Sequence, residues 1–390
     1  MRRVGESEVR RVVFAGGGTG GHIYPGIAVA DSLLALSKKN NVPLEIYWIG
    51  SRSGMDRTLV EKNLSDSGGS ITAFYGIPCG KLRRYFSLQN LVDLFRIAAG
   101  FFRSVALLMK IRPDFLFSKG GFVSVPPCRA ARFLGIPYFT HECDFTLGLA
   151  TKLNSGAAKK ILVSYERTAE QMPVALRSRC LVTGNPVRPV FYTDRAYLGR
   201  EFLGLPSVRH EGEKPILLVL GGSLGARQIN NLVMENLDWL TERFMVVHQT
   251  GNDFANENAD FMSVAHKDYK PYAFIFNEMP FVLQAADIVL SRSGANTLWE
   301  CAVCGKPMVL VPLCGSGTRG DQVDNAMNAK SLGAAQVLLD KEVSGENLRS
   351  CLERLLDAGE RERFAGGCAR LSGHEVPSQT IAELVLEEVR

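Results

Sequence analysis

Short apolar runs alternate with amphipathic segments along most of this 390-residue chain. In the first half, the apolar runs lie at residues 11–16, 44–50, 71–76, 114–120, 138–142 and 160–164. Their length and the turn residues around them are typical of buried strands, whereas segments such as 26–39 have the apolar spacing of a helix. Strands that alternate with helices in this way predict a parallel sheet covered on both faces.

The alternation is interrupted over residues 181–215, an irregular stretch with prolines at positions 186, 189, 206 and 215. It resumes with apolar runs at 216–220, 244–251, 272–277, 287–294, 307–313 and 334–340, and the chain after 344 is helical in pattern. We therefore predict two doubly wound, Rossmann-like α/β domains over residues 1–187 and 188–374, followed by a terminal helix over 375–390. Because ligands of such sheets bind beyond the carboxyl ends of the strands, two facing edges would form a cleft.

Composition narrows the class of protein. The chain is 46% hydrophobic and 22% charged, as soluble globular proteins are, and its net charge of +5 does not favour nucleic-acid binding. The charged start MRRVGESEVR does not resemble a signal peptide, so we expect a cytoplasmic protein. The nine cysteines lie in apolar contexts and are expected to be reduced and buried. Cys301 and Cys304 have CxxC spacing, but a zinc site would need a second close pair.

The first apolar run leads into a glycine-rich loop in VVFAGGGTGGHIYP, residues 12–25. Glycines here let backbone N–H groups approach a ligand, and the following helix N-terminus adds partial positive charge. Gly16, Gly18 and Gly21 match GxGxxG, but the next apolar run ends in YWIGSRSG, without the acidic residue that a dinucleotide enzyme uses for its ribose. Arg52 suits a 2′-phosphate, which keeps an NADP-dependent oxidoreductase as an alternative.

The histidine at the end of this loop, His22, favours a different chemistry. A dinucleotide site does not need an imidazole beside the pyrophosphate, whereas a group-transfer site can use one to take a proton from an attacking hydroxyl. A second loop, GGSLGA at residues 221–226, repeats the strand–glycine–helix arrangement and offers Ser223. Two such loops indicate a donor and an acceptor that both carry phosphate, with a simple tight turn as the alternative for either loop.

Several motifs in order resemble those of the MurG family: GGTGGHIYPGIAVA, SKGGFVSVPP, THECDFTLGLATK, GNPVR, GGSLGA, SRSGANTLWE and DQVDNA. The resemblance covers nearly the whole chain and implies a GT-B architecture, in which two Rossmann-like domains face a cleft. It also implies an inverting transfer of N-acetylglucosamine from its UDP donor to O4 of the muramoyl unit of undecaprenyl-pyrophosphoryl-muramoyl-pentapeptide. This is the step from lipid I to lipid II in peptidoglycan synthesis. Another GT-B enzyme that uses a UDP-sugar is a further alternative.

The resemblance assigns the donor to the second domain. Glu300 is expected to hold the ribose hydroxyls, Gln322 the sugar hydroxyls and the backbone at Phe276 the uracil. Ser223 and Arg188 are expected to contact the diphosphate, to which guanidinium geometry is suited. The other expected donor contacts are Arg292, Ala295, Asn296, Thr297, Asp144, Thr19, Gly20 and Gly21. For Arg292 and Glu300, a structural ion pair is the alternative.

The acceptor is assigned to the first domain, with His22 as the expected base. The expected contacts to its pyrophosphate are Gly17, Gly18, Thr19, Gly20, Gly21, Gly120 and Gly121. His141 and Glu142 end a strand at the same edge and are expected to orient and tune the reacting hydroxyl, with a satisfied core histidine as the alternative for His141. The chain has no Asp-x-Asp pair, so we expect no metal site and no required cofactor beyond the UDP-sugar substrate.

The most apolar long segment lies within residues 81–112 and is a candidate membrane contact. Charged residues interrupt it, so it is not expected to span a bilayer. Arg96, Arg103 and Lys110 are seven residues apart and would form one stripe on a helix. The segment is either a core helix with a solvated face or a surface that rests on anionic lipid and admits a polyprenyl substrate. The second interpretation makes the protein peripheral at the cytoplasmic face of the cell membrane, with cell-wall synthesis proteins as candidate partners.

Overall fold

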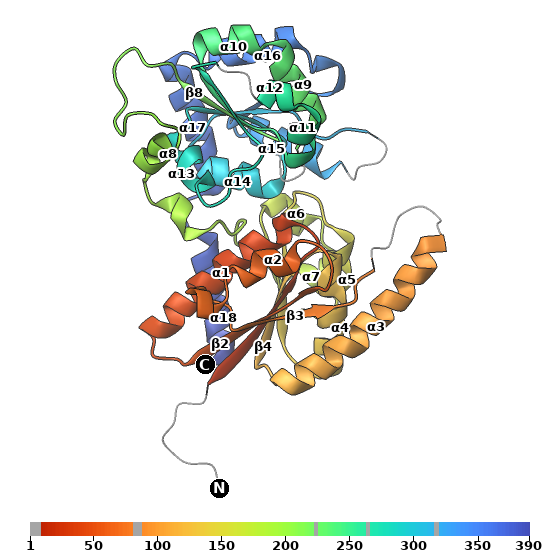
Figure 1. Cartoon of the computed structure of the whole chain (residues 1–390). Helices are drawn as coiled ribbons and strands as arrows, with labels where there is room; N and C mark the ends of the chain where they lie inside the picture. Colours follow the sequence, from red (N-terminus) through yellow and green to blue (C-terminus); the bar gives the residue numbers. More distant parts are fainter. Residues whose placement is uncertain (1–8, 81–87, 222–224, 263–265, 316–319) are drawn as a thin grey trace. The chain divides into compact units, whose positions relative to one another are not determined.

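The computed structural model describes residues 9–80, 88–221, 225–262, 266–315 and 320–390. The chain divides into two compact units, Met1–Pro189 with Glu375–Arg390, and Val190–His374 (Figure 1). This boundary lies two residues after the one that the sequence suggested. The side chain of Gln284 attaches the residues after Pro189 to the second unit, because its Nε2 donates to the carbonyl oxygens of Val190 and Thr193.

The first unit is built on a parallel sheet with the strand order β3-β2-β1-β4-β5-β6-β7. The strands are β1 (Arg10–Gly16), β2 (Leu44–Ser51), β3 (Ala73–Ile77), β4 (Phe115–Gly120), β5 (Tyr138–Glu142), β6 (Lys160–Val163) and β7 (Cys180–Val182). The strand order reverses at β1 and β4. The loops after these two strands therefore lie at the switch point where doubly wound sheets bind ligands.

Helices cover both faces of this sheet. They are α1 (Gly20–Lys39), α2 (Asp56–Glu61), α3 (Leu88–Ile111), α4 (Val125–Phe133), α5 (Leu149–Ser155), α6 (Glu166–Glu170), α7 (Val174–Arg177) and α18 (Pro377–Val389), with 3₁₀ turns η1 (Ser65–Ser67) and η2 (Phe122–Ser124). Val12 and Phe14 of β1 pack into one core with α1 and α18, whereas Val13 and Ala15 pack into another with α3 and α4. This division follows from the alternation of side chains along a strand.

The second unit has a parallel sheet in the order β10-β9-β8-β11-β12-β13. The strands are β8 (Ile216–Leu220), β9 (Met245–Gln249), β10 (Tyr269–Tyr272), β11 (Ile288–Ser291), β12 (Met308–Leu310) and β13 (Ala335–Val337). The helical elements are η3 (Pro189–Tyr192), α8 (Ala196–Phe202), α9 (Arg227–Glu235), α10 (Leu237–Arg243), α11 (Asn252–Glu257), α12 (Ala259–Met262), α13 (Met279–Ala285), α14 (Ala295–Val303), α15 (Asp321–Ser331), η4 (Asp340–Glu342), α16 (Gly345–Arg354) and α17 (Ala358–Ser372). Two parallel-sheet α/β units confirm the predicted fold class.

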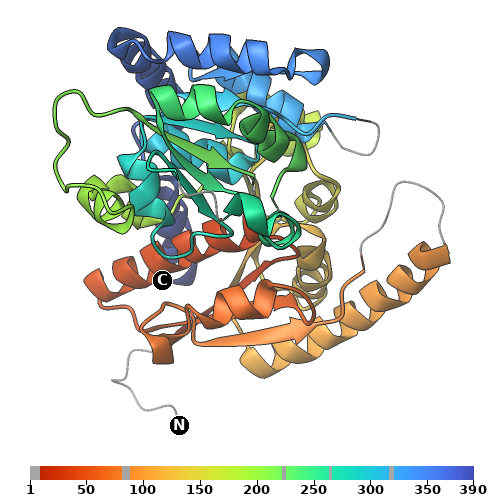
Figure 2. The same cartoon turned by 45° about the horizontal axis from the view of Figure 1, so that its top comes forward.

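The terminal helix α18 belongs to the first unit, where it lies beside α1 (Figures 1 and 2). Ile381, Val385 and Leu386 are buried in the same core as β1. The hydroxyls of Ser32 on α1 and Ser378 on α18 are 3.0 Å apart and buried. The end of the chain thus completes the core around its first strand.

Two sequence expectations about elements were wrong. The strand expected at 272–277 is β10 at Tyr269–Tyr272, and the following N–H of Ile275 donates to the side chain of Gln249 instead of continuing the ladder. The stretch 181–215, expected to be irregular, contains the end of β7 and the helix α8. Edge strands and short helices make few contacts, so their apolar pattern is weak.

Candidate active site

The glycine loop of the first unit occupies residues 17–19, between β1 and α1. Gly18 has a φ of 86°, a conformation that favours glycine. A Cβ at Gly18 would meet the ring of Phe122, and a Cβ at Gly17 would meet the carboxyl group of Asp56. The loop is therefore glycine-rich in part because neighbouring side chains pack directly against its backbone.

Asp56 is the first residue of α2 and a fully buried carboxyl group, and it was not among the site residues expected from the sequence. Its Oδ1 accepts the N–H of Gly18 at 2.8 Å, and its Oδ2 accepts the N–H of Ser51 at 2.7 Å. Burial raises the pKa of Asp56, while these backbone hydrogen bonds lower it. The acidic residue that a dinucleotide enzyme has at the end of its second strand is absent from β2. Asp56, five residues beyond Ser51, instead holds the glycine loop through its hydrogen bond to Gly18. The spacing of a dinucleotide motif could not reveal this.

The imidazole of His22 lies against Gly120 and Gly121, the glycine pair after β4. His22 is in the first turn of α1, and its N–H donates to the carbonyl oxygen of Thr19 at 3.1 Å. A Cβ on Gly121 would lie 2.7 Å from Cδ2 of His22, and Gly120 and Gly121 have φ values of 87° and 75°. The SKGG motif after β4 thus leaves room for the ring. The structure brings together His22 and the expected acceptor glycines of both loops.

His141 is a buried residue of β5 with both ring nitrogens engaged. Its Nε2 donates to the carbonyl oxygen of Gly184 at 2.9 Å, and its Nδ1 lies 3.1 Å from Nζ of Lys119 and accepts from it. Burial, followed by the charge of Lys119, holds the pKa of His141 well below its usual range. This geometry corresponds to the core-histidine alternative, and it makes His141 a positioning residue. Lys119, also fully buried, is a partner that the sequence did not identify.

Glu142 holds the loop after β5 with both carboxylate oxygens. Oε1 accepts the N–H groups of Cys143 and Asp144, and Oε2 accepts the N–H of Gly148 at 2.9 Å and the hydroxyl of Thr151 at 2.6 Å. Burial, with the nearby charge of Asp144, raises the pKa of Glu142. Because of these four hydrogen bonds, the carboxylate of Glu142 has a structural role in holding the loop after β5.

The only cluster in the described residues with metal-ligand chemistry is Glu142, Cys143 and Asp144, whose ligand atoms lie within 4.8 Å of one another. The oxygens of Glu142 are already occupied by hydrogen bonds to its own loop. A cation here would have to displace them, so the donor set does not fit a resident metal.

In the second unit, the expected donor residues lie at the carboxyl ends of neighbouring strands. Arg292 follows β11, and its Nη1 donates to Oε1 of Gln228 at 3.0 Å and to the carbonyl oxygen of Val311 at 2.8 Å. Burial lowers the pKa of Arg292. The guanidinium thus bridges α9 and the loop after β12, a structural role different from the suggested ion pair with Glu300.

The starts of α14 and α15 are tied to each other. The hydroxyl of Ser293 donates to the carbonyl oxygen of Gln322 at 2.7 Å, and Nδ2 of Asn325 donates to the carbonyl oxygen of Ser293. Ala295, Asn296 and Thr297 form the first turn of α14, and Glu300 follows, half-buried, on the same helix. The structure therefore brings most of the expected donor residues to one edge of the sheet.

Gln322 and Phe276, two further expected donor residues, have distinct surroundings. Oε1 of Gln322 accepts the N–H of Leu313 at 2.9 Å, so its amide donor faces away from that bond. Phe276 follows β10 and is 58% exposed, with its ring centroid 4.5 Å from that of Phe274. Ser223 lies outside the described residues.

Arg188 lies in the first unit, not in the second as expected. Its guanidinium is stacked over the ring of Tyr24 on α1, with Cζ 5.1 Å from the ring centroid. Its charge also lowers the pKa of Asp31, although burial raises that pKa more. Arg188 is thus two residues from the unit boundary and close to the helix that carries His22.

The CxxC pair is structural. Cys301 is buried and Cys304 is half-buried, and both are free thiols on or next to α14. Burial raises the pKa of each thiol.

Comparison with known protein families shows the class of enzyme to which this chain belongs. Residues 12–163 match the glycosyltransferase family 28 N-terminal domain, and residues 216–374 match the glycosyltransferase family 28 C-terminal domain. The protein is therefore a glycosyltransferase of family 28 with two GT-B-like α/β units. This excludes the NADP-dependent alternative.

Relatives narrow the class to one family. The chain is 48% identical to the UDP-N-acetylglucosamine--N-acetylmuramyl-(pentapeptide) pyrophosphoryl-undecaprenol N-acetylglucosamine transferase of Treponema denticola, over 96% of each chain. It is 34% identical to the protein of the same name from Geobacillus thermodenitrificans, over 98% of this chain and 99% of that one. The chain belongs to this transferase family, the MurG family.

Solved structures agree on the fold. The crystal structure of Acinetobacter baumannii MurG has a TM-score of 0.68 at 23% identity and covers 97% of this chain and 99% of that one. A UDP-GlcNAc 2-epimerase from Neisseria meningitidis bound to UDP-GlcNAc has a TM-score of 0.64 at 16% identity, covering 97% and 99%. Enzymes of different chemistry thus share this architecture, so the fold alone does not define the function.

Proposed function

We propose that this protein transfers N-acetylglucosamine from UDP-N-acetylglucosamine to O4 of the muramoyl unit of a polyprenyl-pyrophosphate-linked muramoyl-pentapeptide, converting lipid I to lipid II. The observation that carries this proposal is the 48% identity, over nearly the whole chain, to a transferase with that donor and acceptor in its name. The packing of His22 against two glycine loops supports it, because such loops suit an acceptor pyrophosphate.

In the proposed reaction, the acceptor O4 attacks C1 of N-acetylglucosamine. The bond between C1 and the diphosphate oxygen breaks, and its electron pair leaves with UDP. The hydroxyl proton passes to the imidazole of His22, a side chain that commonly serves as a general base. Attack from the face opposite the leaving group inverts the configuration at C1.

Other residues would bind and position the substrates. Gly17 and Thr19 would offer N–H groups to the acceptor pyrophosphate at the start of α1, where the helix dipole favours an anion, while the N–H of Gly18 stays bonded to Asp56. His141 and Glu142 would act through the loops that they hold, not by contact with the reacting atoms. In the second unit, Glu300 would hold the ribose and Gln322 the sugar.

Helix α3 supports association with a membrane surface. In the described residues, no helix is both long enough and apolar enough to span a bilayer. Phe95, Phe102 and Met109 recur every seven residues on α3 and are 70%, 69% and 56% exposed. Each is followed by a basic residue, namely Arg96, Arg103 and Lys110. Exposed aromatic and basic side chains on one stripe suit the interface of an anionic lipid bilayer.

We therefore propose that the protein is peripheral, at the cytoplasmic face of the cell membrane, where a lipid-linked acceptor is available. Lys81, Arg83 and Arg84 precede α3 and lie outside the described residues. Phe133 of α4 is 71% exposed, and its ring centroid is 6.1 Å from that of Phe101, which extends the apolar surface.

The test is UDP release from UDP-N-acetylglucosamine, with and without a short-chain lipid-linked muramoyl-pentapeptide, followed by mass analysis of the product. We expect UDP only when acceptor is present, and a product heavier by one N-acetylhexosamine. UDP release without acceptor would contradict the proposal and indicate an epimerase or hydrolase of similar fold. A parallel reaction in a metal chelator should proceed at an unchanged rate if no metal is required.

A further inference from the structure

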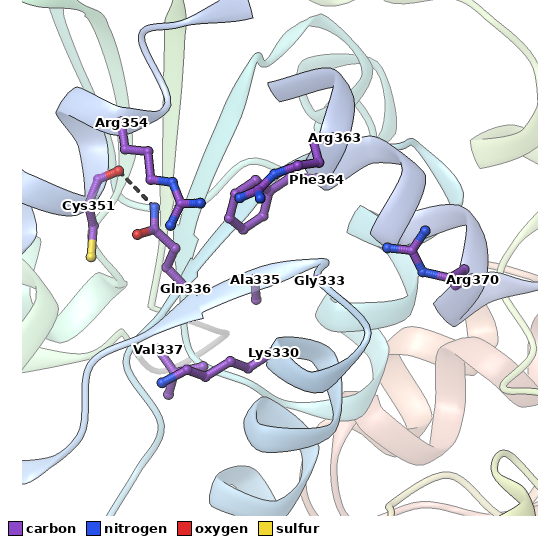
Figure 3. Close-up of a pocket in the computed structure, with 10 residues that line it drawn as sticks. All are labelled: Lys330, Gly333, Ala335, Gln336, Val337, Cys351, Arg354, Arg363, Phe364 and Arg370. Atoms are coloured by element: carbon purple, nitrogen blue, oxygen red, sulfur yellow. Dashed lines mark hydrogen bonds between the residues drawn. The ribbon is translucent and has the colours of Figure 1, made fainter. Parts of the chain in front are cut away.

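A basic pocket lies in the second unit, apart from the residues assigned to the donor. Its volume is about 380 Å³, and it is formed by β13 and by the ends of α15, α16 and α17 (Figure 3). Among the described residues, four cationic side chains and no carboxylate line it. They are Lys330, Arg354, Arg363 and Arg370.

Two of the guanidinium groups lie close to one aromatic ring. The Cζ atoms of Arg354 and Arg363 each lie 5.5 Å from the ring centroid of Phe364. Glu360 accepts Nε of Arg354 at 2.6 Å and Nη2 of Arg363 at 2.9 Å. Figure 3 shows both arginines beside the Phe364 ring. These contacts restrict the arginine rotamers, so less entropy is lost when a ligand binds.

The floor of the pocket is ordered as well. Nε2 of Gln336 on β13 donates to the carbonyl oxygen of Cys351 at 2.8 Å. Arg370 donates through Nε and Nη2 to the carbonyl oxygen of Leu332, at 3.1 and 2.8 Å. Within the described residues, Arg354 donates its hydrogen bond through Nε. Its terminal N–H groups can therefore donate to a ligand in the pocket.

The pocket is distinct from the donor edge. Its lining includes all of β13, Ala335–Val337, whereas the expected donor residues of this unit follow β10, β11 and β12. Helix α15 carries Gln322 in its first turn and Lys330 in its last, about 12 Å apart at 1.5 Å per residue. A ligand in the pocket would therefore not compete with UDP.

We propose that this pocket binds a small soluble ligand that carries a phosphate or diphosphate group. Glu360 pairs with two of the four cations, and the charge of Glu342 reaches Cys351. A local excess of positive charge remains, which an anion would neutralise. Planar guanidinium groups match phosphate oxygens in geometry, and the volume suits a small phosphorylated molecule. This site is separate from the proposed reaction.

The experiment titrates pyrophosphate into the full chain by calorimetry at physiological salt, in the presence of saturating UDP. We expect the parent to have a pyrophosphate site, in addition to any at the acceptor loop of the first unit, that binds at least tenfold more weakly in the variant Lys330→Gln/Arg354→Gln. The matched control, Lys341→Gln/Arg349→Gln, removes two charges from the same region outside the pocket and should bind as the parent does. Urea midpoints of all three chains check that folding is retained.

Three outcomes would overturn the proposal. The first is that the parent binds no pyrophosphate under saturating UDP. The second is that the control variant loses as much pyrophosphate binding as the pocket variant. The third is that the pocket variant loses binding to anionic vesicles while no pyrophosphate binding is seen. The assay needs no turnover, so its result is independent of the proposed transferase activity.

Discussion

The side chains around the first glycine loop have different surroundings. Glu142 makes four hydrogen bonds within its own loop, and His141 uses both ring nitrogens in the core. His22 instead borders the backbone of Gly120 and Gly121 at the start of α1. Burial that is fully hydrogen-bonded favours a structural role for His141 and Glu142.

We expect His22→Ala to lower turnover by roughly 100-fold or more, because a general base commonly contributes that much. The KM for UDP-N-acetylglucosamine should stay unchanged, since the donor is assigned to the other unit. Steady-state kinetics measure both values. His210→Ala removes an exposed histidine and is the control. Turnover within twofold of the parent would remove His22 from the role of base.

Asp56 is expected to position the acceptor loop. Asp56→Asn replaces an oxygen that accepts the Ser51 N–H by an amide donor, which leaves a buried donor unsatisfied at a cost of about 1–3 kcal/mol. The KM for the lipid acceptor should rise about tenfold, while the KM for the UDP-sugar stays constant. Asp66→Asn changes an exposed acid nearby and should have no effect. Equal changes in both KM values would contradict a role specific to the loop.

At the scale of elements, α3 differs from the helices that pack fully on their sheets. Its inner side, with Leu107 and Leu108, belongs to the core, while its outer stripe exposes large apolar side chains. Figures 1 and 2 show it as a long helix along the flank of the first unit. The sequence allowed either a core helix or a lipid-binding surface, and α3 combines a core face with an exposed apolar one.

Replacing the two exposed aromatics, Phe95→Ser/Phe102→Ser, should weaken co-sedimentation with anionic vesicles at least tenfold. Burying each ring in the interface contributes about 1.5–3 kcal/mol. The control Val174→Ser/Val208→Ser removes two apolar side chains that are 78% and 73% exposed elsewhere. If the Phe95/Phe102 variant sediments as the parent does, α3 is not the membrane contact.

At the scale of the whole molecule, the chain begins and ends in the same unit. Residues of α18 complete the core around β1 and α1, although more than 300 residues separate them from those elements in sequence. A last helix of this kind makes the first unit depend on the intact C-terminus.

Leu386→Ala should therefore destabilise the first unit by about 2–5 kcal/mol, the usual cost of a cavity at a fully buried leucine. Hydrogen exchange of the β1 and α1 amides measures the loss. Glu383→Ala, at an exposed position on the same helix, should change stability by less than about 0.5 kcal/mol. Unchanged exchange in Leu386→Ala would mean that α18 is dispensable for the unit.

The sequence by itself determined the alternation of strands and helices, the two α/β units, the glycine loops and the family. These features are encoded locally, in apolar periodicity and in motifs of adjacent residues. Only the tertiary structure decided which ionisable groups are engaged in contacts with other parts of the fold. Asp56 reaching Gly18, Lys119 meeting His141, and Glu142 binding its own loop depend on side-chain contacts between elements that no spacing in the sequence records. The basic pocket and the place of α18 are of the same kind, because each is assembled from residues that only packing brings together.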